Sequence, residues 1–203
     1  MLAKNVNFVI IYSMRRDILD KLKEWKDKSD RKPLILRGVR QAGKTYVLQT
    51  FAETCFPTMH YLNFEKDEKL KAVFENDLVP QRIIQELSFY LNKPIDVDHD
   101  IVIFDEIQNI PRALTSLKYF CEEMPTLAIC AAGSLLGIHL GEASFPVGKV
   151  EFLDMFPMSF LEFLEGIGDI KSVDFIKNCK SFDKIPEVIH SHLFEQLKKY
   201  FVI

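Results

Sequence analysis

The chain has 203 residues, of which 48% are apolar and 27% charged, a composition that excludes disordered, collagen-like and low-complexity proteins. Its 26 basic and 29 acidic residues give a net charge of −3, so no overall basic character draws it to nucleic acid or to an anionic membrane. A chain of this length buries about 70% of its unfolded surface, enough for one sizeable core without disulfides or a structural metal.

The cysteines and the N-terminus bear on the cellular compartment. Four scattered cysteines form no C-x-x-C pair, and the five histidines show no metal-ligand spacing beside them. The only N-terminal apolar run, residues 6–12, is too short to span a membrane and has no cleavage site after it. We therefore expect a cytoplasmic protein with reduced thiols and no membrane contact. Residues 1–13, which precede Met14, are open to interpretation as an upstream extension of the reading frame.

Short apolar runs and helical patterns alternate along most of the chain. Residues 15–30 predict an amphipathic surface helix, because apolar side chains recur with helical period among alternating charges. Buried strands are predicted by apolar runs at 34–37, 60–64, 101–104 and 127–132. Helices are predicted between them, at about 44–54, 67–76, 80–92 and 112–122. This alternation predicts an α/β fold, with a parallel sheet flanked by helices on both faces.

The last quarter of the chain has a different character. It is rich in phenylalanine and predicts helices, apart from a strand pattern at 150–153. Ser159 and Glu162 predict a capping box at the start of one helix, and Pro186 with Glu187 opens a second helix. We divide the chain into an N-terminal segment with its helix (1–30), a core (31–150) and a small helical C-terminal extension (151–203). Three bulky apolar residues close the sequence, which favours a piece of a longer protein.

Residues 38–45 read G-V-R-Q-A-G-K-T and match the phosphate-binding pattern G-x-x-x-x-G-K-[ST] between a predicted strand and a predicted helix. Its glycines let successive amides turn toward phosphate, and the helix N-terminus adds partial positive charge. We expect Lys44 to reach the β and γ phosphates and Thr45 to ligate Mg2+. The core is therefore predicted to be a P-loop NTPase, with ATP bound by Gly38, Arg40, Gln41, Ala42, Gly43, Lys44, Thr45 and Tyr46.

Two acidic residues follow the apolar strand at 101–104, at the strand end where open parallel sheets place their ligands. We expect Asp105 to hold Mg2+ and Glu106 to orient and deprotonate a water for attack on the γ phosphate. Ser134 ends the next predicted strand and is expected to sense that phosphate; an ordinary turn serine is the alternative. The predicted catalytic residues are thus Glu106, Lys44 and Ser134, and the predicted metal ligands are Thr45 and Asp105. Glu65, at another strand end, is open to either a nucleotide contact or plain solvation.

Other enzyme classes fit the same residues less well. A GTPase needs an N-K-x-D base-recognition motif, and the match at 92–95 lacks the aspartate. A serine hydrolase needs G-x-S-x-G, which Gly133-Ser134 does not provide. A glutamate directly after the metal-binding aspartate favours attack by water over transfer to a bound acceptor, as in a nucleoside kinase.

Taken together, the motifs resemble one group of prokaryotic AAA+ ATPases. The resemblance rests on the loop at 38–45, F-D-E-I-Q at 104–108, A-G-S at 132–134 and F-P-M-S-F-L-E-F at 156–163, and it spans about residues 15–203. It implies an N-terminal P-loop ATPase domain that is followed by a C-terminal domain of unknown function. The group usually has Gly-Arg where this chain has Gly148-Lys149. Lysine keeps the charge but lacks the planar fork of arginine, so Lys149 is open to either a phosphate-sensing role or a place as a surface lysine after a turn glycine.

We expect Mg2+-dependent binding and hydrolysis of ATP. The alternative is a nucleotide-dependent switch with little turnover, which regulates a C-terminal effector or a DNA-associated partner. A scaffold that binds no nucleotide is disfavoured by the intact motifs. A homo-oligomer, and a nucleic acid or protein partner recognised by a missing domain, both stay open. Arg40 and Arg112 are further cations that are candidates for contact with phosphate or with a neighbouring subunit.

Overall fold

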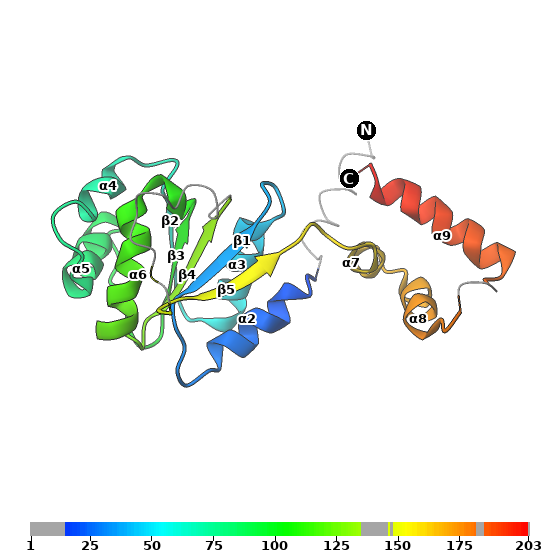
Figure 1. Cartoon of the computed structure of the whole chain (residues 1–203), viewed down its shortest axis with the longest axis horizontal. Helices are drawn as coiled ribbons and strands as arrows, with labels where there is room; N and C mark the ends of the chain where they lie inside the picture. The colour runs from blue at the N-terminus through cyan, green and yellow to red at the C-terminus, as the bar shows by residue number, and fades with distance from the viewer. Residues whose placement is uncertain (1–14, 135–145, 147, 182–184, 203) are drawn as a thin grey trace. The chain divides into compact units, whose positions relative to one another are not determined.

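The computed structural model describes residues 15–134, 146, 148–181 and 185–202 (Figure 1). Residues 1–13, with their interpretation as an upstream extension, and the last residue of the chain lie outside the described residues. The chain divides into two compact units. The sheet unit is Ile18–Pro157, and the helical unit consists of the described parts of residues 1–17 and 158–203.

Strands and helices alternate through the sheet unit, as predicted. In chain order these are α2 (Ile18–Lys26), β1 (Leu34–Gly38), α3 (Lys44–Cys55), β2 (Met59–Asn63), α4 (Lys69–Val73), α5 (Pro80–Tyr90), β3 (Ile101–Asp105), the 3-10 turn η1 (Ile107–Asn109), α6 (Pro111–Glu123), β4 (Ala128–Gly133) and β5 (Glu151–Met155). The five strands form one sheet in the order β2-β3-β4-β1-β5. All four neighbouring pairs are parallel, which confirms the predicted α/β fold.

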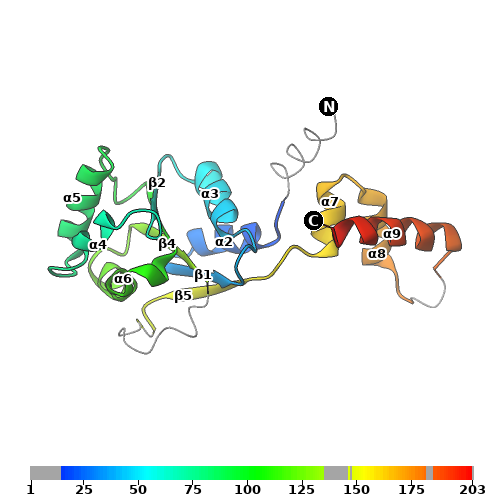
Figure 2. The same cartoon turned by 90° about the horizontal axis from the view of Figure 1, so that it is seen from above.

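Each face of the sheet carries its own hydrophobic core, because alternate residues of a strand point to opposite faces. On β3, Ile101 and Ile103 pack with side chains of α2 and α3, whereas Val102 and Phe104 pack with α4, α5 and α6. Figure 2 shows these helices around the strands. Because β3 is buried along its whole length, any ligand site on it lies at one of its ends.

Close packing of two strands fixes the end of β1. A Cβ atom on Gly38 would lie 2.2 Å from the carbonyl oxygen of Met155 in β5, far inside van der Waals contact. Glycine is therefore required here by the neighbouring strand as well as by the turn that follows. Sequence analysis drew a boundary just before this strand, at 150/151, yet β5 pairs with β1 along its whole length and belongs to the sheet. The three-part division of the chain stays a prediction.

The helical unit contains α7 (Phe160–Gly166), α8 (Ile170–Asn178) and α9 (Glu187–Tyr200). The predicted capping box is present: Glu162 N–H donates to Ser159 Oγ, and Ser159 N–H donates to the Glu162 carboxylate. Pro186 precedes α9, as expected. Helix α8 was not predicted, although Asp169 caps it by accepting the Ser172 N–H. Apolar side chains of the three helices form a small separate core.

All four cysteines are free thiols, in agreement with the interpretation of their spacing. Burial of Cys130 in the middle of β4 raises the pKa of its thiol. None of the helices in the described parts of the chain is long and apolar enough to cross a membrane.

Candidate functional site

The predicted site residues meet at one edge of the sheet, where β1, β3 and β4 end. Parallel strands place all their carboxyl ends on the same side. Gly38 ends β1, Asp105 ends β3, and Gly133 pairs with Arg37, which puts Ser134 at the level of the phosphate loop. Ser134 is half-buried there.

The loop between β1 and α3 has the shape that its motif predicts. Gln41 and Gly43 have φ angles of 64° and 90°, so the backbone turns twice through the left-handed region. Such turns point successive amides into one concavity, which suits an anion. Helix α3 begins at Lys44, and Gly43 provides no side-chain cap for its first amides. The N-terminus of α3 therefore faces the loop as an uncapped, partially positive end.

Lys44 lies at the centre of this loop with only 7% of its surface exposed. Its ammonium donates hydrogen bonds to the carbonyl oxygens of Gly38 (3.0 Å) and Val39 (2.9 Å). Burial lowers the pKa of Lys44, while the charges of Glu106 and Asp105 act in the opposite direction. A buried ammonium held by neutral carbonyls gains most from an added anion, which fits a phosphate in the loop.

The other predicted loop residues surround Lys44 on both sides. Arg40 and Gln41 are exposed, Ala42 is buried, and Tyr46 is half-buried in the first turn of α3. All of them thus lie on the loop or helix start that the motif assigned to ATP.

Asp105 joins the phosphate loop to the central strand. The Thr45 hydroxyl donates to Asp105 Oδ2 at 2.8 Å, across sixty residues of sequence. Tyr61 of β2 donates to the same oxygen at 2.6 Å, and the Glu106 N–H donates to Asp105 Oδ1 at 3.0 Å. Asp105 is only 2% exposed, so these donors compensate for the loss of hydration around its charge.

Glu106 follows in a conformation that few non-glycine residues adopt. Its φ angle of 53° is left-handed, which turns the chain sharply out of β3 into η1. Gln108 Nε2 donates to Glu106 Oε2 at 2.5 Å. The amide oxygen of Gln108 is buried with no hydrogen-bond partner within the described residues. The glutamate is therefore held by a neighbour in the same turn, beside an acceptor that this conformation leaves unsatisfied.

These residues fit a magnesium nucleotide. A hydroxyl and a carboxylate in direct contact, Thr45 and Asp105, are oxygen donors of the kind that Mg2+ takes together with phosphate oxygens. No group of three or more His, Cys, Asp or Glu side chains in the described ranges could hold a metal ion by itself, so at this site phosphate oxygens would have to complete the ligand set. The uncapped helix start and the buried ammonium supply the matching positive surface for phosphates.

Three other predicted candidates lie outside this cluster of contacts. Lys149 precedes β5 and pairs with Glu122 at 2.9 Å, at the opposite edge of the sheet, about 16 Å of strand away from the loop. Arg112 donates one hydrogen bond to the carbonyl oxygen of Phe74 at 2.5 Å. Glu65 is exposed after β2, and its N–H donates to Asn63.

Sequence analysis missed Tyr61, Asn63 and Gln108. Tyr61 and Asn63 are two residues apart on β2, so they lie on the same side of a strand whose other side carries Leu62 and Phe64. Two polar side chains at alternate positions of a predicted strand were a signal that the sequence offered. Gln108 gave no such signal, because its contact with Glu106 depends on the left-handed turn.

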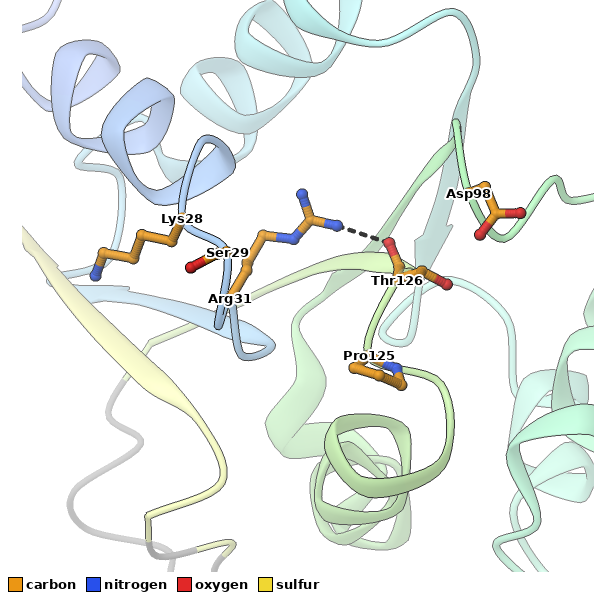
Figure 3. A pocket seen from close by; sticks show the side chains of 6 residues that line it. All are labelled: Lys28, Ser29, Arg31, Asp98, Pro125 and Thr126. Carbon is orange, nitrogen blue, oxygen red and sulfur yellow. Dashed lines mark hydrogen bonds between the residues drawn. The ribbon is translucent and has the colours of Figure 1, made fainter.

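Two pockets lie near the amino-terminal ends of the strands. Figure 3 shows one of them between residues that precede β1, β3 and β4, where Arg31 donates to the carbonyl oxygen of Thr126 at 2.7 Å. A second pocket lies beside Thr58 and Asp100, before β2 and β3. Neither of these two pockets is lined by residues of the phosphate loop.

A family model described as an AAA domain matches residues 30–164, a range that includes every residue of the cluster. No curated protein sequence matches the chain.

Solved structures with the same fold include a Walker-type ATPase of Pyrococcus abyssi, at a TM-score of 0.50 and 17% identity over 89% of this chain and 62% of that one. The ORC1 protein of Aeropyrum pernix in complex with DNA matches at 0.47 and 17%, over 74% and 47% of the two chains. The Pif1 helicase of Candida albicans matches at 0.44 and 12%, over 85% and 44%. The chain thus spans less than two thirds of the length of each of these structures.

Proposed function

This chain belongs to the AAA domain family, and on that premise we propose that it binds ATP with Mg2+ and hydrolyses it. The observation that carries the proposal is the hydrogen bond from Thr45 to Asp105, because it joins the phosphate loop to the acidic end of β3. With Lys44 buried beside it, this contact brings a cation, a hydroxyl and a carboxylate together at one edge of the sheet.

Each element of the site has one task in binding. The amides of the loop 38–45 and the Lys44 ammonium hold the phosphates, while Thr45 and Asp105 would hold the metal. Bound there, Mg2+ would neutralise charge on the phosphate oxygens. Ser134 directly follows β4, the strand beside β1, and its proposed role is to contact the terminal phosphate.

Glu106 is the proposed general base. It would accept a proton from a water aligned with the γ phosphate, while that water forms the new bond to phosphorus and ADP leaves. Two features support this role: Glu106 directly follows Asp105, and its carboxylate interacts electrostatically with Lys44 of the phosphate loop. The carboxylate is also oriented by Gln108, which limits the positions it can take.

The proposal is tested by two variants that separate binding from turnover. Lys44→Ala removes the buried cation and should weaken ATP binding by roughly 100-fold or more. Glu106→Gln keeps the shape of the side chain and should retain ATP affinity while losing about 10² to 10⁴-fold in turnover. ATP affinity is measured by calorimetry with and without Mg2+, and turnover by phosphate release.

Each pattern of results has a definite meaning. Equal loss of binding in both variants would contradict the assigned roles. Tight Mg2+-dependent binding by the unmodified chain without phosphate release would replace the hydrolase with a nucleotide-dependent switch. Absence of ATP binding by the unmodified chain would contradict the proposed function altogether.

A further inference from the structure

A tyrosine from the neighbouring strand donates a hydrogen bond to the proposed metal-binding aspartate, and the phosphate-binding motifs assign it no role. Strand β2 pairs with β3 so that Tyr61 lies beside Ile103 and Asn63 lies beside Asp105. Tyr61 and Asn63 therefore lie beside the carboxyl end of β3, where the proposed metal-binding Asp105 is. Their side chains contact each other, since Asn63 Nδ2 is 3.1 Å from the Tyr61 hydroxyl.

The direction of every hydrogen bond in this group is fixed. Asn63 Oδ1 accepts the N–H groups of Glu65 and Lys66, both at 3.0 Å, so the amide nitrogen of Asn63 faces Tyr61. An amide nitrogen donates only, so the Tyr61 hydroxyl accepts from it. The single hydroxyl proton of Tyr61 is then directed to Asp105 Oδ2, at 2.6 Å.

Counting acceptor positions shows what Tyr61 does to Asp105. Each carboxylate oxygen has about two lone-pair positions. On Oδ2 both are taken, by the hydroxyls of Thr45 and Tyr61. On Oδ1 one is taken by the Glu106 N–H, and within the described residues the other has no donor. A cation that binds Oδ2 directly must displace a donor, whereas the remaining position on Oδ1 can accept a hydrogen atom from a metal-bound water.

Divalent cations differ in how readily they give up water. Mg2+ dehydrates reluctantly and keeps several waters, whereas Ca2+ takes carboxylate oxygens directly. We propose that Tyr61 is a positioning residue that sets the cation preference of the site: by occupying Asp105 Oδ2, it favours hydrated Mg2+ over Ca2+. This inference rests on the proposed binding of a metal nucleotide at Thr45 and Asp105.

The matched variant is Tyr61→Phe, which removes one hydroxyl and frees one acceptor position on Asp105. Calorimetry would measure the affinity for the non-hydrolysable analogue adenylyl imidodiphosphate, in Mg2+ and separately in Ca2+. We expect the unmodified chain to prefer Mg2+, and the Mg2+ to Ca2+ affinity ratio to fall about tenfold in Tyr61→Phe. The control is Tyr90→Phe, which removes a tyrosine hydrogen bond to Asp67 outside the site and should leave the ratio unchanged.

An unchanged ratio in Tyr61→Phe would overturn the inference while leaving nucleotide binding intact. If the unmodified chain binds the analogue with neither cation, the proposed function fails and the inference fails with it.

If Tyr61→Phe does not fold, Asn63→Asp tests the same group of hydrogen bonds. A carboxylate at position 63 would accept the hydrogen bond of the Tyr61 hydroxyl, which would then no longer donate to Asp105. Its added charge would raise the affinity for both cations, so the ratio is still the measure. A fall in the ratio supports the inference, and no fall overturns it.

Discussion

Asp105 in the sheet unit and Glu162 in the helical unit are both buried carboxylates that accept three hydrogen bonds from described residues, but their partners differ. Glu162 accepts from the Arg16 guanidinium at 3.0 Å and from the N–H groups of Asp17 and Ser159 at 2.9 and 2.7 Å. The donors to Asp105 within the described residues are two hydroxyls and one amide, all neutral.

The difference fits a structural role for Glu162 and supports the metal-binding role proposed for Asp105. A buried charge is stable when an opposite charge and hydrogen bonds replace its hydration. Glu162 has both from within its own unit, and it also caps α7, so no further partner is needed. Asp105 has hydrogen bonds only, because the nearby Lys44 ammonium donates to carbonyl oxygens instead. The Lys44 charge acts on Asp105 without a hydrogen bond between them, so among the described residues no cationic side chain takes the place that the proposed metal ion would fill.

Replacing Glu162 by alanine is expected to have the largest effect on stability. The change removes the charge partner of a guanidinium that is only 10% exposed, together with both backbone contacts, and should cost the helical unit about 3–5 kcal/mol. Denaturant unfolding measures this loss, and ATP affinity should not change. The control is Glu165→Ala, which breaks an ion pair with the exposed Lys177. A smaller loss for Glu162→Ala than for this control would contradict the structural role.

Acid should remove part of the same stabilisation. Burial raises the pKa of Glu162, but the N–H groups of Ser159 and Asp17 and the Arg16 charge outweigh it, so the net pKa is lowered from 4.5. Because the unfolded carboxyl takes up its proton first, the stabilisation is complete above about pH 4.5 and is lost as the pH falls through the folded pKa. The stability difference between the unmodified chain and Glu162→Gln should therefore shrink below this pH. A difference that stays constant on acidification would contradict the account.

The smallest effect is expected at the opposite edge of the sheet. Lys149→Ala breaks a surface ion pair with Glu122 and should leave ATP affinity unchanged, because the phosphate loop lies at the other end of β1 and β5. Calorimetry with ATP and Mg2+ checks this. A clear loss of affinity would show that Lys149 contacts the phosphates. It would contradict the proposal that ATP is bound at the carboxyl ends of the strands and not at their amino-terminal ends.

The parts of the fold that sequence could predict are those written in local patterns. The loop at 38–45 and the apolar strand before Asp105 are continuous stretches, so their structure follows from residues next to each other. Strand β5 was predicted less clearly, because it is the outermost strand of the sheet and some of its side chains are exposed. Helix α8 was not predicted, because the segment is short and few of its residues are buried. Its one start signal is the capping contact between Asp169 and Ser172.

The parts of the site that sequence could not predict depend on pairing between strands. Tyr61 contacts Asp105 only because β2 pairs with β3 in one register, and a shift by one residue would turn its side chain to the other face. The separation of Lys149 from the phosphate loop likewise follows from the register of β5 against β1. Local motifs thus predict where the candidate site lies, whereas the pairing of the strands determines which other side chains contact it.

Hydrogen–deuterium exchange of the Glu106→Gln variant, with and without ATP and Mg2+, tests the central claim most directly. Ligand binding slows exchange where the bound state is stabilised. The account predicts slower exchange in peptides that cover 38–46 and 104–109, and no change at 28–31 and 124–126 on the opposite edge or in α9. Protection at the opposite edge without protection of the phosphate loop would contradict it.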